Sequence, residues 1–242
     1  MLAFSAGFLY SDYEETLQMK WEASQLKNLS KKKICVGVCL LVMFILWTVL
    51  VCLVDVQPIG PQDSVVGFAA LNGAFHRLTG VHMALYDLTD WLSVLPLGIV
   101  VGFAALGLVQ LIGRKSLQKV DFSIFVLGGF YVVVMAAFVL FEVLEINYRP
   151  VLIKGVLEAS YPSSTTMLVM CVMPTTMLQL KDRLENSAFK RILLAAIALF
   201  TAFMVISRLI SGVHWLTDII GGALLSAGLV VLYDAVCGIE KR

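Results

Sequence analysis

The 242-residue sequence predicts an all-α integral membrane protein. We expect six transmembrane helices in one bundle, with interfacial helices in the N-terminal arm and in the first external loop. Hydrophobic residues make up 60% of the chain and charged residues only 14%, whereas soluble domains carry about 25% charged residues. The apolar residues also cluster in runs of roughly 20, the length that crosses the hydrocarbon of a bilayer as a helix.

Six runs are predicted to cross the membrane. Five of them approach or reach the required length, at residues 34–56, 92–112, 122–144, 192–210 and 215–236. The other, at residues 165–180, is shorter and is interrupted by Pro174. Around these runs the sequence divides into a cytoplasmic arm (1–33), a six-helix membrane domain (34–237) and a cytoplasmic tail (238–242).

Basic residues are distributed unevenly between the two sides of the membrane. If the N-terminus is cytoplasmic, 14 of the 18 lysine and arginine residues lie in cytoplasmic segments, and only Arg77, Arg149, Lys154 and Arg208 lie outside. Because cytoplasmic loops are enriched in Lys and Arg, both termini are predicted to be cytoplasmic. The segment 57–90 then becomes an external loop, and we expect it to lie along the membrane interface as a short helix or a lid.

Composition also limits the expected partners. A net charge of +1 does not indicate a nucleic-acid partner, so membrane lipids are the expected surroundings. The five cysteines lie in or beside apolar spans without the spacing of metal ligands, and we interpret them as packing residues. We therefore expect neither a metal nor a cofactor. His76 and His82, in the first external loop, are interpreted as structural.

Three polar segments are predicted to meet at the outer face. They are "EINYRP" after the third span, "YPSSTT" before the fourth, and "SRLISGVHWLTD" between the fifth and sixth. Ionisable residues near membrane depth are costly and commonly functional. The sequence therefore predicts a site that faces outward at the level of the lipid head groups.

Two of these segments carry groups that suit an anion. Ser160 or Ser163 is predicted to cap a helix, and the open amide groups of a helix N-terminus bind anions. Arg149 and Arg208 each offer a planar guanidinium that matches phosphate oxygens. The alternatives are a plain helix cap and arginines that extend to the interface, but two arginines on the side depleted of basic residues favour an anion site.

His214 and Asp218 are four residues apart, so on one helical turn they would share a face. A carboxylate that accepts a hydrogen bond from one imidazole nitrogen fixes the tautomer and makes the other nitrogen more nucleophilic. A histidine at a helix end is also common as a plain interfacial residue. The nearby Arg208 makes a catalytic role at least as well supported.

The segment "SRLISGVHWLTD" resembles the SRxxxxxHxxxD signature of the type 2 phosphatidic acid phosphatase superfamily. Arg149-Pro150 and "PSST" stand where the KxxxxxxRP and PSGH motifs of that family would fall. The resemblance implies a six-helix membrane core and metal-independent removal of phosphate from a lipid through a phosphohistidine. It implies that His214 is the nucleophile and Asp218 its orienting partner. It also implies a phosphate cradle, formed by Arg149, Ser163, Arg208 and the backbone of Ser164.

Two positions depart from the family pattern. Glu142 stands where the first motif has a lysine, so a cationic phosphate ligand is replaced by an anion. Thr165 stands where the second motif has a histidine that resembles a general acid. A threonine cannot deliver a proton near neutral pH, and loss of a positioned acid costs about 10²- to 10⁴-fold in rate.

Two functions remain open from the sequence. The first is a lipid phosphate or pyrophosphate phosphatase with polyprenyl diphosphate as the preferred substrate, because a phosphate leaving group needs less protonation than an alkoxide. In that case Lys154 is a candidate to replace the lost cation. The second is a catalytically impaired pseudoenzyme that uses the retained cradle to bind or transport a phosphorylated lipid.

Overall fold

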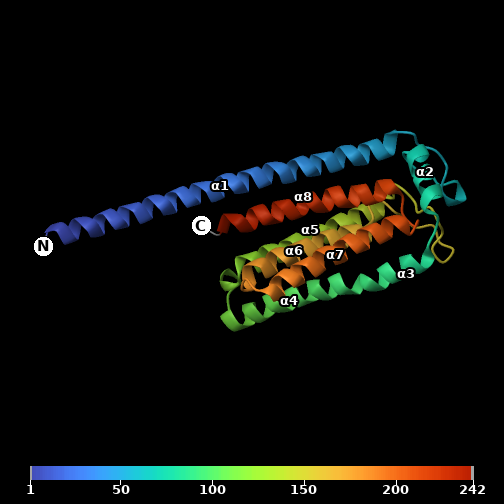
Figure 1. Cartoon of the computed structure of the whole chain (residues 1–242). Helices are drawn as coiled ribbons and strands as arrows, with labels where there is room; N and C mark the ends of the chain where they lie inside the picture. Colours follow the sequence, from blue (N-terminus) through green and yellow to red (C-terminus); the bar gives the residue numbers. More distant parts are fainter. Residues whose placement is uncertain (1, 241–242) are drawn as a thin grey trace.

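The computed structural model describes residues 2–240, and the tail residues Lys241 and Arg242 lie outside this range. The described chain is helical, without extended strands, which confirms the all-α class (Figure 1). Two 3-10 turns, Pro61–Asp63 and Leu117–Lys119, lie in loops. The α-helices are α1 (Leu2–Leu53), α2 (Ala69–Thr79), α3 (Met83–Leu92), α4 (Val94–Arg114), α5 (Phe122–Leu144), α6 (Ser164–Arg183), α7 (Ala188–Ile210) and α8 (Leu216–Glu240).

Five helical segments are long and apolar enough to cross a membrane, which supports a multi-pass membrane protein. They are Asn28–Leu53, Met83–Arg114, Phe122–Leu144, Ala188–Ile210 and Leu216–Ile239. The second begins well before the expected residue 92, because α3 continues into α4 through Ser93, which itself has helical backbone angles.

The sixth expected span corresponds to α6, which is not among these five segments in the described chain. Helix α6 is less apolar because it faces protein, and ten of its 20 residues are buried. Two of its hydroxyl groups are satisfied within the helix: Thr175 and Thr176 donate to the carbonyls of Cys171 and Val172. Crossing by α6 therefore stays a prediction.

Helix α1 contains both the predicted arm and the predicted first span. No break separates them at residue 33, because no proline precedes Pro58 in the chain. The first half of α1 projects beyond the bundle in line with the second half (Figure 1). Helix α1 therefore passes residue 33 without a break, and the division there between arm and membrane domain stays a prediction, as does an interfacial position of the arm.

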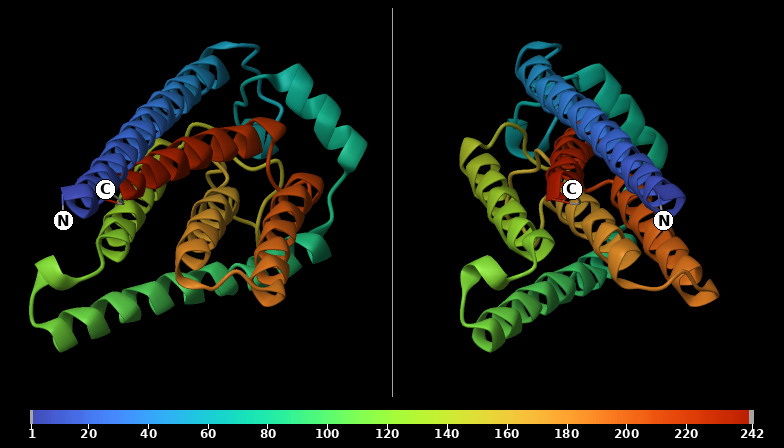
Figure 2. Two further views of the ribbon diagram at one scale, coloured as in Figure 1. Left: turned by 60° about the vertical axis from the view of Figure 1, so that its left-hand side comes forward. Right: turned by 90° about the vertical axis from the view of Figure 1, so that its left-hand side faces the viewer.

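The bundle is built around α8. Helix α1 packs along α8, where Gly37 and Gly228 lie against Leu232 and Leu41 so closely that a Cβ atom would fall within 3 Å of each leucine side chain. Small residues allow such close helix approach in membranes. Helices α5 and α6 contact the rest of α8, and α4 lies on the side of the bundle opposite α1 (Figure 2).

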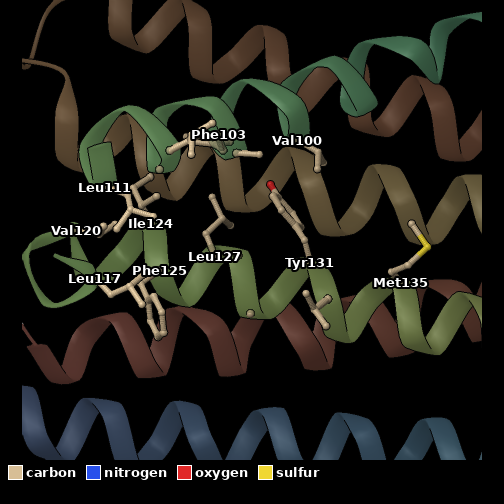
Figure 3. Close-up of a pocket in the computed structure, with 16 residues that line it drawn as sticks. Val100, Phe103, Leu111, Leu117, Val120, Ile124, Phe125, Leu127, Tyr131 and Met135 are labelled. Carbon is tan, nitrogen blue, oxygen red and sulfur yellow. The ribbon is translucent and has the colours of Figure 1, made fainter. Parts of the chain in front are cut away.

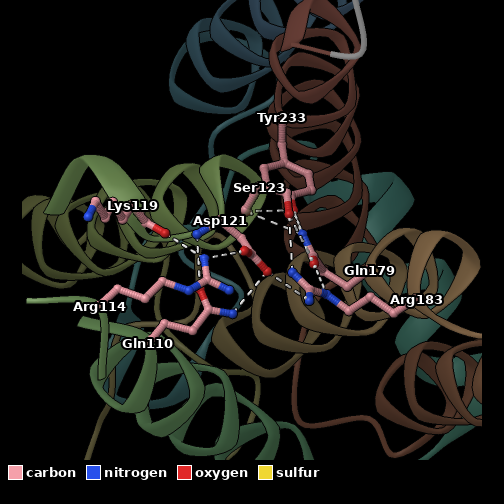
Figure 4. Close-up of polar contacts among 8 residues, drawn as sticks. All are labelled: Gln110, Arg114, Lys119, Asp121, Ser123, Gln179, Arg183 and Tyr233. Atoms are coloured by element: carbon pink, nitrogen blue, oxygen red, sulfur yellow. Dashed lines mark hydrogen bonds and ion pairs between the residues drawn. The ribbon is translucent and has the colours of Figure 1, made fainter. Parts of the chain in front are cut away.

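One end of the bundle is closed by a polar cluster around Asp121 (Figure 4). Arg114 of α4 and Arg183 of α6 lie 2.8 Å and 3.1 Å from its carboxylate oxygens. These arginines, with Gln110, lower the pKa of Asp121 to about 2. Tyr233 of α8 donates to the backbone of Ser123 in the same cluster. The cluster therefore joins the ends of four helices, far along the bundle from the three polar segments.

At the other end, the segment 57–90, which is predicted to be the first external loop, packs on the turn between α7 and α8. Gly212 in this turn has φ +69°, and a Cβ atom there would lie 2.0 Å from the carbonyl oxygen of Gly80. The amide of His82 donates to the carbonyl of Ser211, and a ring nitrogen of His76 lies 3.1 Å from the carbonyl oxygen of Gly212. Both histidines thus hold the loop against the turn, as their structural interpretation predicts.

Candidate active site

The three polar segments come together around a cavity of about 180 Å³ between α5, α6 and the turn before α8. His214 and Arg149 both line it, together with Ser164 at the start of α6. Its remaining polar lining comes from Glu142, Glu158, Ser160 and Tyr161. The convergence predicted from the sequence is therefore present in the fold.

His214 and Asp218 are in contact, although His214 lies in the turn rather than on α8. The Nδ1 atom of His214 is 3.6 Å from Oδ2 of Asp218, slightly longer than a hydrogen bond. The carboxylate of Asp218 also accepts from the amide of Trp215 at 2.9 Å and from the side chain of Asn147 at 3.3 Å. These donors fix the completely buried carboxylate beside the imidazole.

The tautomer of His214 follows from its second neighbour. Its Nε2 atom lies 3.3 Å from Nη1 of Arg149, and a guanidinium can only donate. The Nε2 atom therefore carries the lone pair, and the proton lies on Nδ1, toward Asp218. Burial lowers the pKa of His214 to about 4; the nearby arginines add to this effect, and Asp218 opposes it. At neutral pH the imidazole is thus neutral, as a nucleophile requires.

Both predicted cradle arginines are buried at the site. Nη2 of Arg208 donates to the hydroxyl of Thr165 at 2.6 Å and lies 3.3 Å from the carboxylate of Asp90. Its guanidinium stacks 4.5 Å from the ring of Tyr86. Nε of Arg149 lies 3.0 Å from the carboxylate of Glu158. Two guanidinium groups are therefore held in fixed positions near His214.

The start of α6 has the predicted cap. Ser163 accepts from the amide of Thr166, and its own amide donates to the backbone carbonyl of Asp218. Because Ser163 is completely buried and does not line the cavity, its side chain serves as a helix cap here rather than as a cavity group. Ser164 lines the cavity instead, so the predicted role of its backbone is compatible with the structure.

The two departures from the family pattern lie at the site. Glu142 lines the cavity near Arg149, so a carboxylate does occupy the region expected for the motif lysine. Thr165 contacts Arg208 through its hydroxyl. Lys154, in contrast, is exposed within the α5–α6 segment and does not line the cavity. The structure therefore gives no support to Lys154 as a replacement cation.

Sequence reasoning missed four residues of the site. Asp90 and Tyr86 come from α3, Glu158 from the segment before α6, and Asn147 from the start of that segment. None of them stands at a specified position of the three motifs. The only available signal for Asn147 was its place inside "EINYRP", and the loop containing Asp90 and Tyr86 gave none.

Apolar cavities adjoin the polar one. A cavity of about 320 Å³ lies between α4, α5 and α6, and shares Phe138, Ser164 and Met167 with the polar cavity. A larger cavity of about 700 Å³ continues between α4 and α5, whose side chains face each other across it (Figure 3). The two apolar cavities share Val100, Tyr131 and Met135. An apolar path thus runs from the polar site along the bundle.

No group of three or more His, Cys, Asp or Glu side chains is arranged to hold a metal ion within the described part of the chain. The absence of a metal and of a cofactor stays a prediction. The chemistry available from the described side chains is that of a neutral imidazole beside two guanidinium groups, which suits attack on phosphorus.

Comparison with known proteins agrees with this geometry. A protein-family model described as the PAP2 superfamily matches residues 142–236, the region that begins at Glu142 and contains Arg149, His214 and Asp218. The resemblance to the PAP2 superfamily is confirmed. The match to the PAP2 model covers α6, α7 and most of α8, whereas α1 to α4 lie outside it.

One solved structure resembles the whole fold. It is the crystal structure of the first transmembrane PAP2 type phosphatidylglycerolphosphate phosphatase from Bacillus subtilis. It has 21% sequence identity and a TM-score of 0.55, and the likeness covers 85% of this chain and 96% of the other. At this identity the likeness establishes a shared membrane fold. No curated protein sequence matches the chain significantly.

Proposed function

We propose that this protein is a membrane-embedded lipid phosphate or pyrophosphate phosphatase that acts at the outer face through a phosphohistidine, with polyprenyl diphosphate preferred. The observation that carries the proposal is the geometry of His214. It is buried and neutral, its Nε2 atom lies 3.3 Å from Nη1 of Arg149 at the cavity that both residues line, and Asp218 lies 3.6 Å from its other nitrogen.

In the proposed reaction, Nε2 of His214 attacks the terminal phosphorus. An N–P bond forms while the P–O bond to the lipid breaks, and the electron pair leaves on the lipid oxygen. Arg149 and Arg208 stabilise the charge that develops on the phosphoryl oxygens. Asp218 stabilises the Nδ1 proton as the ring becomes positive. Water then hydrolyses the N–P bond, releasing phosphate and restoring neutral His214.

The leaving group supports a diphosphate substrate. Thr165 cannot deliver a proton at neutral pH, so an alkoxide would leave slowly. A lipid diphosphate instead expels a lipid monophosphate, a far weaker base that needs little protonation. The hydroxyl of Thr165 contacts Arg208, and both could donate hydrogen bonds to that leaving phosphate.

The apolar path supports a long lipid tail. It extends along α4 from Ser93 to Leu111, which corresponds to about 27 Å of helix. This is close to the full hydrocarbon thickness of about 30 Å, whereas an ordinary acyl chain is matched to one leaflet of about 15 Å. A polyprenyl chain fits such a path better than a phospholipid acyl chain does.

A second function is favoured by one specific observation. Glu142 places a carboxylate in the cavity where the family has a lysine, which weakens phosphate stabilisation. Together with the missing acid, this supports the alternative of a pseudoenzyme that binds or transports a phosphorylated lipid. The retained pair of His214 and Asp218 favours catalysis.

Phosphate release by the purified protein in detergent tests the proposal. We expect release from polyprenyl diphosphate to exceed release from phosphatidic acid, and His214→Ala to abolish both. The double variant Glu142→Lys with Thr165→His restores the family pattern. If only this double variant releases phosphate, while the native protein binds lipid phosphates, the pseudoenzyme account is correct.

A further inference from the structure

Both cradle arginines are already paired with carboxylates. We propose that Asp90 and Glu158 compete with the phosphate of the ligand for Arg208 and Arg149, and so weaken phosphate binding and favour the release of free phosphate. This inference rests on the proposed function, because it assigns the two guanidinium groups to phosphate binding. Neither carboxylate belongs to a sequence motif, so the assignment comes from the contacts alone.

The pairing at Arg208 joins a buried cation to an accessible anion. The Arg208 side chain is 2% exposed and the Asp90 side chain 63% exposed, and their nearest charged atoms are 3.3 Å apart. Asp90 also lines the apolar cavity beside Ser164 and Thr165. It therefore lies where the phosphate region meets the predicted tail path, and its exposed side chain has room to rotate away from Arg208.

The pairing at Arg149 has the same form. The Arg149 side chain is 10% exposed and the Glu158 side chain 40% exposed, at 3.0 Å. The backbone amide of Arg149 also donates to the backbone carbonyl of Glu158, which keeps the two residues side by side. Glu158 lines the polar cavity, so its carboxylate lies among the groups that a bound phosphate would contact.

These two ion pairs are expected to weaken the binding of phosphate at the site. A buried guanidinium needs a counter-ion, and Asp90 and Glu158 supply it. An entering phosphate must replace both carboxylates, which weakens the binding of every phosphate compound. A lipid regains this loss by burying its tail in the adjoining apolar cavity. Orthophosphate and soluble phosphate esters cannot, so the carboxylates leave them weakly bound and favour the release of free phosphate, while the tail keeps a lipid bound.

Binding of orthophosphate to the purified protein tests the inference without catalysis. We expect Asp90→Asn and Glu158→Gln each to lower the Kd for orthophosphate by about 2- to 5-fold, the range of a partly exposed ion pair. Asp90→Glu retains the negative charge and should leave the Kd unchanged within about twofold. The melting temperature in detergent should fall in the two neutral variants, because each buried arginine loses a counter-ion.

Matched controls are carboxylates outside these pairs. Asp87→Asn, in the same helix as Asp90, and Glu145→Gln, in the same segment as Glu158, should change the Kd by less than about twofold. If Asp90→Asn and Glu158→Gln both leave the Kd unchanged or raise it, the inference is wrong. If the two neutral variants have a lower melting temperature but do not bind orthophosphate more tightly, the carboxylates act only in stability. That result would also contradict the inference.

Failure of the proposed function has a different signature. Arg149→Ala and Arg208→Ala should weaken orthophosphate binding by more than about tenfold if the cradle is real. If these variants lose binding while the carboxylate variants do not gain it, only the inference about Asp90 and Glu158 fails. If the arginine variants bind orthophosphate normally, the phosphate site itself is wrong.

Discussion

At the scale of single residues, the site combines a neutral imidazole, the proposed nucleophile, with two guanidinium groups that are already paired with carboxylates. His214 is buried between Asp218 on one nitrogen and Arg149 on the other. Burial first, and the two guanidinium groups in addition, lower the pKa of the imidazole, so His214 keeps its lone pair at neutral pH. The contacts of His214 thus account for its proposed nucleophilicity. Thr165 offers no evident proton donor for the leaving group.

The protonation state of His214 gives a direct prediction. Because burial lowers its pKa to about 4, the imidazole should stay neutral from pH 8 to about pH 5 and become protonated only as the pH falls through 4. Imidazole nitrogen NMR shifts in detergent measure this, and the chain has three histidines, so His214→Ala identifies the signal. A titration midpoint near or above the ordinary value of 6.5 would contradict the buried, neutral imidazole.

Motif residues were predictable from the sequence, and their counter-ions were not. Spacing of four residues predicts the contact of His214 with Asp218, because the turn and the first turn of α8 keep them on one side. Asp90 is more than 100 residues away from Arg208 along the chain, and their contact depends on how the first external loop packs. No periodicity or motif encodes such a distant pairing, so only the fold reveals it.

At the scale of elements, α6 contributes to the polar site, whereas α4 and α5 line the apolar cavities. Helix α6 carries the polar site at its N-terminus and is mostly surrounded by protein, which explains its weak hydropathy signal. Helices α4 and α5 enclose the apolar path, and Gly128 lines it, with open space where a Cβ atom would stand. Hydropathy predicted the bounds of α5 well. It could not predict that α3 continues into α4 without a break, because that continuity depends on the helical backbone at Ser93.

The apolar path can be blocked at Gly128. We expect Gly128→Phe to reduce phosphate release from undecaprenyl diphosphate by about tenfold, because a large side chain fills the cavity. Release from farnesyl diphosphate should change by less than about twofold, since a short tail ends before that point. Gly113→Phe, on open surface of α4 outside the cavity lining, is the matched control. Equal losses on both substrates would contradict tail binding between α4 and α5.

At the scale of the whole molecule, the bundle separates two polar ends. The cluster around Asp121 joins four helices at one end, and the candidate site lies at the other, near α2 and α3 (Figures 1 and 4). Basic residues predict that the Asp121 end is cytoplasmic. Composition was sufficient to predict a multi-pass helical protein, whereas the continuous α1 follows from the lack of a helix breaker near residue 33.

Orientation is tested by cysteine labelling in intact cells, in a variant whose five native cysteines are replaced. Lys154→Cys, in the exposed α5–α6 segment, should react with a membrane-impermeant maleimide without permeabilisation. Lys115→Cys, at the end of α4, should react only after permeabilisation. The reverse pattern would place the candidate site on the cytoplasmic side.

The proposed mechanism requires that His214 forms a covalent bond to phosphorus. The most direct measurement is to mix the protein with polyprenyl diphosphate labelled in its terminal phosphate, stop the reaction within one turnover and locate the label by peptide mass spectrometry. The account predicts an acid-labile phosphate on His214 that is absent from His214→Ala. Phosphate release without any label on His214, or label on another residue that persists in His214→Ala, would contradict it.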